Sequence, residues 1–425
     1  MMLRKNPPQR HKRHREERYE LMYSEARLIP SMSRTQWLFR FRQDRSIREA
    51  LFVFLLTRGL IFLIFIVAGQ FSVVSHPESN TRDAIIRFEP ASISENLRRT
   101  MWQADVIHYV VISQEGYHRA PFDINDRRSH EYAFFPLFPM LLWLLGRVTT
   151  GVVLWGAVLC NVFFFIALVL LHKLTLAFGY DDSVAGRTIF YLAVFPFSYF
   201  FSIPLTESLF VLLTVASFYA AKREHWWTAG IIGLLASATR LTGVLLLPSL
   251  LVLSWQMYRS LHVRKIMGLL LIPCGLFAYM FYSWWLSGDA LAFKHAAEAW
   301  GRKPSLFFLP PLVRFLYPPH VIADPWNIYL LSTGAAVLCF ICIYILTKRR
   351  EWALALYTLM SVIIPLSSGV TQSLGRYSMG FFPVFIALGL GTNSNHTDQA
   401  TRVLLVFLLG IMTLLFAAGF TNALS

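Results

Sequence analysis

The stretch LFVFLLTRGLIFLIFIVAGQFSVV, Leu51–Val74, decides the fold class of this chain. It is apolar over the length that a helix needs to cross a bilayer, roughly 20 residues. Its hydrophobic residues do not alternate in steps of two, as they do in lipid-facing β-strands. Because backbone polar groups in lipid must be satisfied internally, a continuous apolar stretch of this length predicts a transmembrane helix.

Blocks of the same kind recur through the sequence. Hydrophobic residues make up 56% of the 425 residues and charged residues 15%, below the roughly 25% charged residues of soluble domains. We therefore expect an all-α, polytopic integral membrane protein of about ten or eleven transmembrane helices. The further predicted spans are Val152–Leu171, Thr188–Ile203, Leu205–Ala221, Ile266–Leu286, Trp326–Leu346, Trp352–Leu366, Met379–Leu390 and Val403–Phe420.

Two apolar segments are predicted not to be simple spans. Tyr132–Val148 is short and contains Pro136 and Pro139, so we expect a re-entrant or juxtamembrane helix on the outer side. Trp226–Tyr258 has a polar break at Ala238–Gly243 and basic residues at both ends. It is predicted to form a hairpin of two short helices, with the break at the outer tip.

The charge distribution predicts the topology. The formal net charge is +15, and residues 1–48 alone contain 13 Lys or Arg. We expect these residues to form a disordered cytoplasmic tail on an anionic inner leaflet, which excludes a nucleic-acid-binding reading. Residues 49–425 then form the membrane-embedded domain, with a large first extracytoplasmic loop at about 75–131 and a second outer loop at about 287–325.

Candidate catalytic acids gather in or beside the first outer loop. Asp105 and His108 are three residues apart, so on a helix they share a face, where a carboxylate beside an imidazole suits general-base chemistry. A surface ion pair is the structural alternative. Glu131 ends the loop and is a further candidate. Glu207 opens a span after Pro204 and is either a helix cap or a functional acid.

Two arginines are predicted to lie at the outer boundary of the membrane. Arg240 and Arg376 are embedded among apolar residues on the side where the positive-inside rule disfavours cations. A guanidinium there can bind a lipid-linked phosphate through two hydrogen bonds. The alternative is that each side chain extends to the lipid headgroups.

Neither a metal site nor a bound cofactor is expected. Cys339 and Cys342 form a CxxC within an apolar segment without nearby partners, so buried packing is favoured over zinc or redox chemistry. The acidic pairs Asp181–Asp182 and Asp123–Asp126 are better explained as loop acids. No glycine-rich phosphate loop is present.

Several motifs, taken in order, resemble those of the PIG-V-type mannosyltransferases, the family of GPI mannosyltransferase 2. The resemblance covers roughly Asp105 to Pro383. The matching motifs are His108-Tyr109 with Gly116-Tyr117, Ala133-Phe134-Phe135-Pro136, Phe195-Pro196-Phe197-Ser198-Tyr199-Phe200-Phe201-Ser202-Ile203-Pro204-Leu205-Thr206-Glu207-Ser208-Leu209-Phe210, Ala238-Thr239-Arg240-Leu241-Thr242-Gly243 after Trp226-Trp227, and Gly375-Arg376-Tyr377.

The resemblance implies a GT-C glycosyltransferase that takes its sugar from a polyprenyl-phosphate carrier on the extracytoplasmic side. It places the catalytic acid on Asp105, although the family has Trp before this residue and this chain has Ala104. The departing lipid phosphate needs positive charge, which Arg240 or Arg376 can supply, and Tyr377 is a further predicted donor-phosphate residue. Compact loops make the chain more similar to the prokaryotic branch than to the eukaryotic enzymes, which add the second mannose of the GPI anchor.

The expected reaction is transfer of a sugar, by resemblance mannose, from polyprenyl (dolichyl) phosphate to a lipid-linked or surface glycan. The membrane is the plasma membrane in a prokaryote and the endoplasmic reticulum in a eukaryote. The first alternative is a transporter or flippase of lipid-linked glycans, which requires charges near mid-membrane and two related halves. A non-catalytic scaffold subunit is the second.

Overall fold

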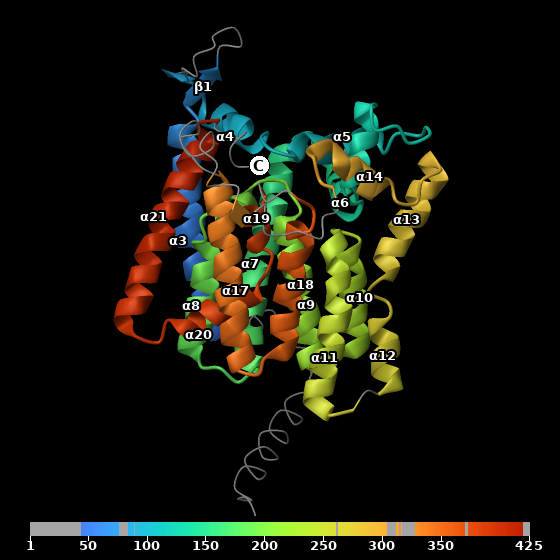
Figure 1. Cartoon of the computed structure of the whole chain (residues 1–425). Coiled ribbons are helices and arrows are strands. Elements are labelled where there is room, and N and C mark those ends of the chain that lie inside the picture. Colours follow the sequence, from blue (N-terminus) through green and yellow to red (C-terminus); the bar gives the residue numbers. More distant parts are fainter. Residues whose placement is uncertain are drawn as a thin grey trace, which may run out of the picture. The chain divides into compact units, whose positions relative to one another are not determined.

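Helices form almost all of the computed structural model, which describes residues 44–75, 84–88, 90–260, 262–303, 312–313, 316, 328–369 and 373–419 (Figure 1). Most of the predicted basic tail and about half of the second predicted outer loop lie outside these residues. The pattern of residue contacts divides the chain into two units, Met1–Arg48 and Glu49–Ser425. The site and the networks described below belong to the second unit.

Within the described residues, six helical segments are long and apolar enough to cross a bilayer, so the chain is an integral membrane protein, as predicted. They are α3 (Arg45–Ala68), α7 (Val152–Ala177), η3 with α11 (Leu241–Leu245 and Leu246–Tyr258), α12 with α13 (Val263–Leu269 and Cys274–Ser287), α17 (Ile328–Lys348) and α21 (Asn395–Ala417).

The other apolar helices are shorter than the prediction of ten or eleven full spans requires. They are α6 (Leu137–Gly146), α8 (Asp182–Ala193), α9 (Glu207–Lys222), α10 (Trp226–Ser237), α18 (Trp352–Leu366) and α20 (Pro383–Gly391). At 1.5 Å per residue even α9, with 16 residues, extends about 24 Å. The predicted span Thr188–Ile203 is corrected: α8 ends at Ala193, and turns and the 3-10 helix η2 (Ser198–Ser202) follow.

Short elements connect the longer helices, and several of them gather at one end of these helices, the polar end, at the top of Figure 1. They are β1 (Phe71–Ser75), β2 (Ala84–Phe88), α4 (Ile93–Met101), α5 (Val106–Glu115), η1 (Arg127–Ala133), α14 (Ala292–Ala297), η4 (Glu298–Trp300) and α19 (Leu374–Ser378). The two strands pair antiparallel, Phe71 opposite Phe88. The first predicted span is therefore too long: α3 ends at Ala68, and β1 takes up the residues to Ser75.

The two unusual segments are shaped largely as predicted. Tyr132–Val148 contains only the 10-residue helix α6, too short to span. Trp226–Tyr258 is broken between Ser237 and Leu241, and α10 lies before the break and α11 after it. Arg240 is the extended residue at this break, with φ of −153°.

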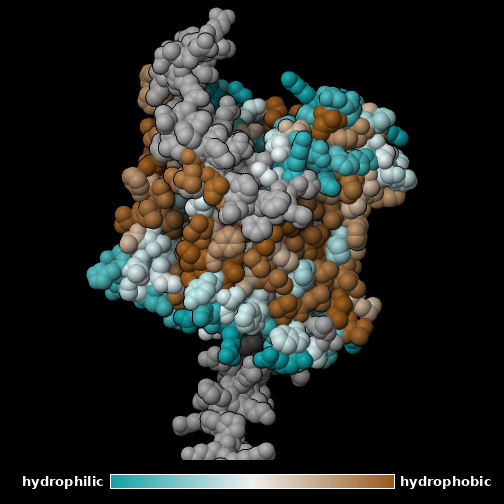
Figure 2. Space-filling view, in the orientation of Figure 1, coloured by the Kyte–Doolittle hydropathy of each residue, from teal (hydrophilic) through white to brown (hydrophobic). Residues whose placement is uncertain are grey.

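The outer surface of the helices is apolar. Large side chains such as Phe52 on α3 (68% exposed) and Phe281 on α13 (66% exposed) face outward. On the face shown in Figure 2, hydrophobic residues cover the middle of the helices and hydrophilic residues gather at both ends. An exposed apolar surface of this extent is expected where a protein contacts lipid.

One arginine lies buried within the first span. Arg58 on α3 donates hydrogen bonds to the carbonyl oxygens of Ala193 (3.0 Å) and Ser198 (2.8 Å) and to the hydroxyls of Ser198 (2.7 Å) and Ser202 (3.1 Å). Its guanidinium also lies 4.6 Å from the ring centroid of Phe164. No ion pair of Arg58 is found in the described part of the chain. This side chain therefore fixes the non-helical segment between α8 and α9.

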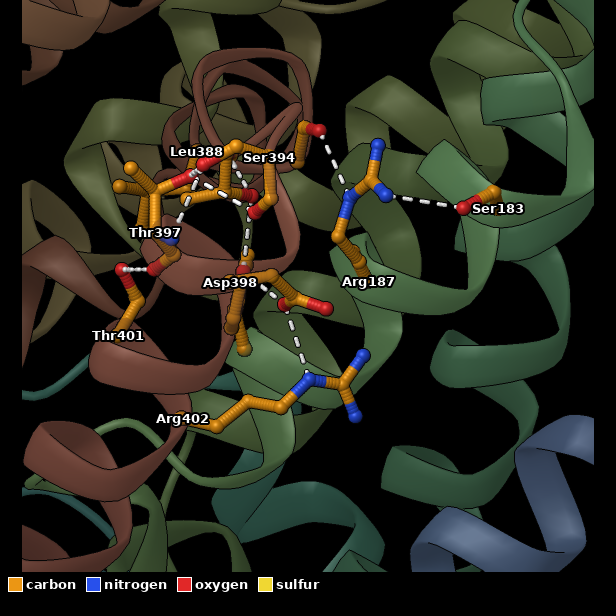
Figure 3. A network of polar contacts seen from close by, with 11 residues as sticks. Ser183, Arg187, Leu388, Ser394, Thr397, Asp398, Thr401 and Arg402 are labelled. Atoms are coloured by element: carbon orange, nitrogen blue, oxygen red, sulfur yellow. Dashed lines mark hydrogen bonds and ion pairs between the residues drawn. The ribbon is translucent and has the colours of Figure 1, made fainter.

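A second polar network joins α8 and α21 at the end of the helices away from α19 (Figure 3). Asp398 accepts hydrogen bonds from the Tyr191 hydroxyl (2.5 Å) and from Arg402 Nε (2.9 Å). Arg187 donates to the carbonyl oxygen of Gly389 (3.1 Å) and to the hydroxyl of Ser183 (2.9 Å). We call Arg187, Tyr191, Asp398 and Arg402 the α8–α21 network.

Candidate active site

Four charged side chains from four separate segments meet at the polar end of the helices. Arg376 donates from Nη1 to Asp105 Oδ2 (2.6 Å) and from Nε to Glu207 Oε1 (2.7 Å). Arg240 donates from Nη2 to the same Glu207 oxygen (2.6 Å) and from Nε to the hydroxyl of Thr206 (2.9 Å). We call these four residues, Asp105, Glu207, Arg240 and Arg376, the charged cluster.

Each member of the cluster lies at the end or interruption of a helix. Asp105 immediately precedes α5, and Glu207 is the first residue of α9. Arg240 lies at the break between α10 and η3, and Arg376 lies on the short helix α19. Backbone amides and carbonyls at such ends are not all used within the helix, which makes these positions suitable for binding.

The residue before Asp105 has an unfavourable backbone conformation. Ala104 has φ of 55°, in the left-handed region, which costs a residue other than glycine about 1–2 kcal/mol. Such conformations persist where surrounding contacts hold them, and they are common at active sites. Here the ion pair to Arg376 holds Asp105 in place.

Two motif glycines allow close packing around the cluster. A Cβ at Gly375 would lie 2.6 Å from the ring of Phe197, and a Cβ at Gly243 would lie 2.4 Å from the backbone of Ala236. Both distances are too short for a side chain. The glycines therefore let α19 and η3 approach their neighbours, which positions Arg376 and Arg240.

Three members of the cluster, Asp105, Arg240 and Arg376, line a cavity of about 610 Å³. Its volume is in the range of small-molecule sites. Lining side chains include two carboxylate-paired arginines, the further cations Lys294 and Arg302, and many aromatic residues. The aromatic lining residues are Tyr109, Phe134, Phe135, Phe210, Phe293, Trp300, Tyr377 and Phe381.

The electrostatics keep Asp105 ionised. Burial alone would raise the pKa of Asp105, but the Arg376 guanidinium, together with His108 and Arg302, outweighs burial and holds this pKa below its ordinary value. The side chain is 29% exposed, and the one hydrogen bond found to it within the described structure is to Oδ2. An ionised carboxylate on a cavity wall can accept a proton from a bound hydroxyl.

His108 and Glu131, the other predicted catalytic residues, are not among the residues that line the cavity. His108 stacks on Phe134, with ring centroids 4.6 Å apart, and contacts Trp300 edge-on at 5.9 Å. Burial lowers the pKa of His108, which favours the neutral imidazole. Glu131 is buried on η1, and burial raises its pKa to about 7. Their catalytic roles remain predictions.

The structure adds residues that the sequence does not single out. Arg302 donates a hydrogen bond to the hydroxyl of Tyr377, and Lys294 lines the same cavity. Thr206 bonds Arg240 and lies 3.4 Å from the Tyr109 hydroxyl. Thr206 lies next to Glu207 in the same sequence motif, which could have drawn attention to it. Arg302 lies outside every motif, so no sequence pattern distinguishes it from other loop cations.

The structure is thus a helical membrane protein with acids and guanidiniums around one cavity at an end of its helices. The motif evidence agrees with a comparison to family models: the one described as mannosyltransferase (PIG-V) matches residues 47–258. The chain belongs to the PIG-V mannosyltransferase family, as the motifs predicted. Asp105, Glu207 and Arg240 all lie within the matched residues.

A solved structure with partial similarity is the oligosaccharyltransferase of Archaeoglobus fulgidus, crystallised with zinc and sulfate. Its sequence is 13% identical, the TM-score is 0.41, and the match covers 73% of this chain and 48% of that chain. This chain thus spans about half the length of that protein. A search of curated protein sequences finds no match.

Proposed function

We propose that this protein transfers a mannosyl residue from a polyprenyl-phosphate carrier to a hydroxyl of a lipid-linked or surface glycan. The observation that carries the proposal is the ionised Asp105 on the wall of a cavity that also presents guanidinium groups. A carboxylate suits the attacking hydroxyl, and guanidiniums suit the departing phosphate. Family membership supports glycosyl transfer, and the chemistry of the cavity supports a phosphate-linked donor.

The proposed reaction is a single displacement. The acceptor oxygen forms a bond to the anomeric carbon, and its proton passes to Asp105. The bond between that carbon and the phosphate oxygen breaks, and its electron pair leaves with the phosphate. The sugar is inverted at the anomeric carbon. Because the phosphate gains one negative charge, cations near it stabilise the transition state more than the bound donor.

The two acids of the cluster have different roles in the proposed reaction. Glu207 is 1% exposed and shares one oxygen between Arg240 and Arg376. It holds both guanidiniums in place, and it is not among the residues that line the cavity. Asp105 is more exposed and lines the cavity. Asp105 is therefore the general base in the proposed reaction, and Glu207 is a positioning residue.

The test is transfer from radiolabelled polyprenyl-phosphate mannose by purified protein in detergent. The expected result is a labelled, mannosylated acceptor with wild-type protein and a loss of label transfer with Asp105→Asn. GDP-mannose serves as the comparison donor. Transfer from GDP-mannose but not from the lipid-linked sugar would contradict the proposal, and so would movement of an intact lipid-linked glycan without chemistry.

The second element of the proposal is the side of the membrane. The basic residues before α3 favour a cytoplasmic N-terminus, which places the cavity end outside. In a variant without the native cysteines, Ser94→Cys on α4 should react with an impermeant maleimide in intact cells. Gln399→Cys, on α21 beside the α8–α21 network, should react only after permeabilisation. The reverse pattern would invert the topology.

A further inference from the structure

The cations of the cavity differ in what neutralises them. Arg376 contacts both carboxylates of the cluster, and its side chain is 4% exposed. Arg240 contacts one of those carboxylates and is 18% exposed. Arg302 has only a neutral partner, the hydroxyl of Tyr377, among the described residues. Arg376 thus uses its hydrogen-bond donors on protein carboxylates, whereas Arg302 has N–H donors left for a ligand.

Tyr377 marks the point on which the guanidiniums converge. The guanidinium carbons of Arg240 and Arg302 lie 5.4 Å and 5.3 Å from its ring centroid. Its hydroxyl accepts a hydrogen bond from Arg302. Two cations around one neutral ring create a positive region on the cavity wall, which favours an anion.

The described residues of the cavity carry more positive than negative charge. Asp105 and Glu207 offset Arg240 and Arg376, with which they form ion pairs. Arg302 and Lys294 also line the cavity, and neither forms an ion pair in the described part of the chain. A phosphate monoester carries about −1.5 to −2 charges at neutral pH. The excess of two positive charges matches that anion.

We propose that Arg302, with Tyr377 and Arg240, forms the subsite for the leaving phosphate, and that Arg376 is not a phosphate ligand. This inference rests on the proposed function and reassigns the predicted phosphate role of Arg376. In the displacement described above, the donor is a phosphodiester with one negative charge. The product is a phosphate monoester with a second charge, so Arg302 acts most strongly as the bond to the sugar breaks.

The subsite is tested with the product, a short-chain polyprenyl monophosphate, which reports phosphate binding without turnover. Its inhibition constant and its directly measured affinity are compared for wild type, Arg302→Gln and Arg302→Lys. The expected loss for Arg302→Gln is about tenfold or more, the value of one charge-assisted hydrogen bond. The Lys variant should recover part of the affinity, because it keeps the charge but not the planar fork.

A matched control is Arg127→Gln, which removes an exposed arginine from η1 that is absent from the cavity lining. It should bind the product as wild type does. The acceptor Michaelis constant should change little in all variants. A general loss of structure would instead weaken both product binding and acceptor binding. Equal product affinity in Arg302→Gln and wild type would overturn the subsite.

The two proposals fail in different ways. Transfer from polyprenyl-phosphate mannose that is insensitive to Arg302→Gln would leave the function intact and overturn the subsite. Product binding that depends on Arg302, without any transfer from the lipid-linked donor, would support the subsite and overturn the function. If Arg302 is required for binding GDP and polyprenyl monophosphate does not bind, the phosphate subsite would be supported. The claim that the phosphate belongs to a lipid carrier would then be overturned.

Discussion

The protein contains two networks of arginine and acid, one at each end of its helices, and they are built differently. In the charged cluster, the Arg376–Glu207 pair is 4% and 1% exposed and joins α19 to α9. In the α8–α21 network, Arg402 and Asp398 are 39% and 20% exposed and lie four residues apart on one helix (Figure 3). The first network assembles distant segments around a cavity, whereas the second ties helix ends together at the surface.

This difference indicates what each network does. Surface ion pairs contribute little to stability, typically 0–1 kcal/mol, because water screens them. Buried pairs carry a large desolvation cost, and removing one partner leaves an uncompensated charge. The α8–α21 network is thus expected to tolerate substitution, and the charged cluster is not. A costly arrangement of this kind is best explained by a function that uses the charges.

The largest expected effect is on stability. Glu207→Gln leaves Arg376 and Arg240 without their shared carboxylate and should cost about 3–5 kcal/mol of unfolding free energy. Arg402→Gln, the matched change at the other end, should cost about 0.3–0.5 kcal/mol, because its pair is of the i,i+4 type. Thermal unfolding in detergent measures both. Equal losses for the two variants would remove the distinction between the networks.

The next effect is on activity alone. Asp105→Asn should remain folded and inserted but lower mannosyl transfer by about 10²-fold or more, the range typical of losing a general base. Asp398→Asn makes the same chemical change in the α8–α21 network and should leave the rate within about twofold. Initial rates per amount of folded protein provide the measurement. Near-normal activity of Asp105→Asn would move the base to Glu207 or Glu131.

A smaller effect is expected from changing the shape of a cation. Arg240 uses Nε for Thr206 and Nη2 for Glu207, a geometry that lysine cannot reproduce. Arg240→Lys should raise the donor Michaelis constant about tenfold and leave the acceptor constant unchanged. Arg240→Ala should be nearly inactive. Arg187→Lys is the control, since Arg187 also divides its donors between two partners; if both Lys variants lower only the melting temperature, Arg240 is structural.

A pH-dependent effect is expected from a buried acid outside both networks. Burial raises the pKa of Glu131 to about 7, and its Oε2 has no hydrogen-bond partner in the described structure. A carboxyl whose folded pKa is raised stabilises the fold at low pH, and this contribution is lost as pH rises through about 7. Melting temperatures of wild type should therefore fall from about pH 5 to pH 8.

Glu131→Gln should flatten this dependence. Glu115→Gln, at a nearby exposed position, should keep most of it, because burial is the main cause of the raised pKa of Glu131. If the melting temperature of Glu131→Gln falls with pH as steeply as that of wild type, another group causes the pH dependence. A change in the pH dependence of transfer, with the stability profile unaltered, would instead give Glu131 the catalytic role that the sequence predicted for it.

The sequence identifies the members of the charged cluster but not their pairing. Arg240 and Arg376 are conspicuous because a cation among apolar residues needs a reason, and Asp105 and Glu207 lie in recognisable motifs. Their partners, however, lie 33 to 271 residues apart in the chain. Such separations are determined by how the helices pack, which no local pattern encodes.

The missed features have the same origin. Helix lengths were overestimated because apolar residues continue through segments such as 194–206, where buried turns replace helix. Arg302 resembles any loop cation until Tyr377 is placed beside it. The β1–β2 hairpin follows a glycine at the end of an apolar block, and apolar β-branched residues there fit a helix as readily as a strand.

Arg58 has a consequence for the order in which the protein is made. Its partners Ser198 and Ser202 follow it by 140 and 144 residues. At about 5–20 residues per second, a ribosome needs roughly 7–30 s to reach them. During that interval the first span resides in the bilayer with an unpartnered guanidinium, at a cost of about 2.5–3.5 kcal/mol near the helix centre. Until then the apolar side chains of α3, later joined by α7, keep the first span in the bilayer. Arg58 reaches its partners only when the segment leading to Glu207 has been synthesised.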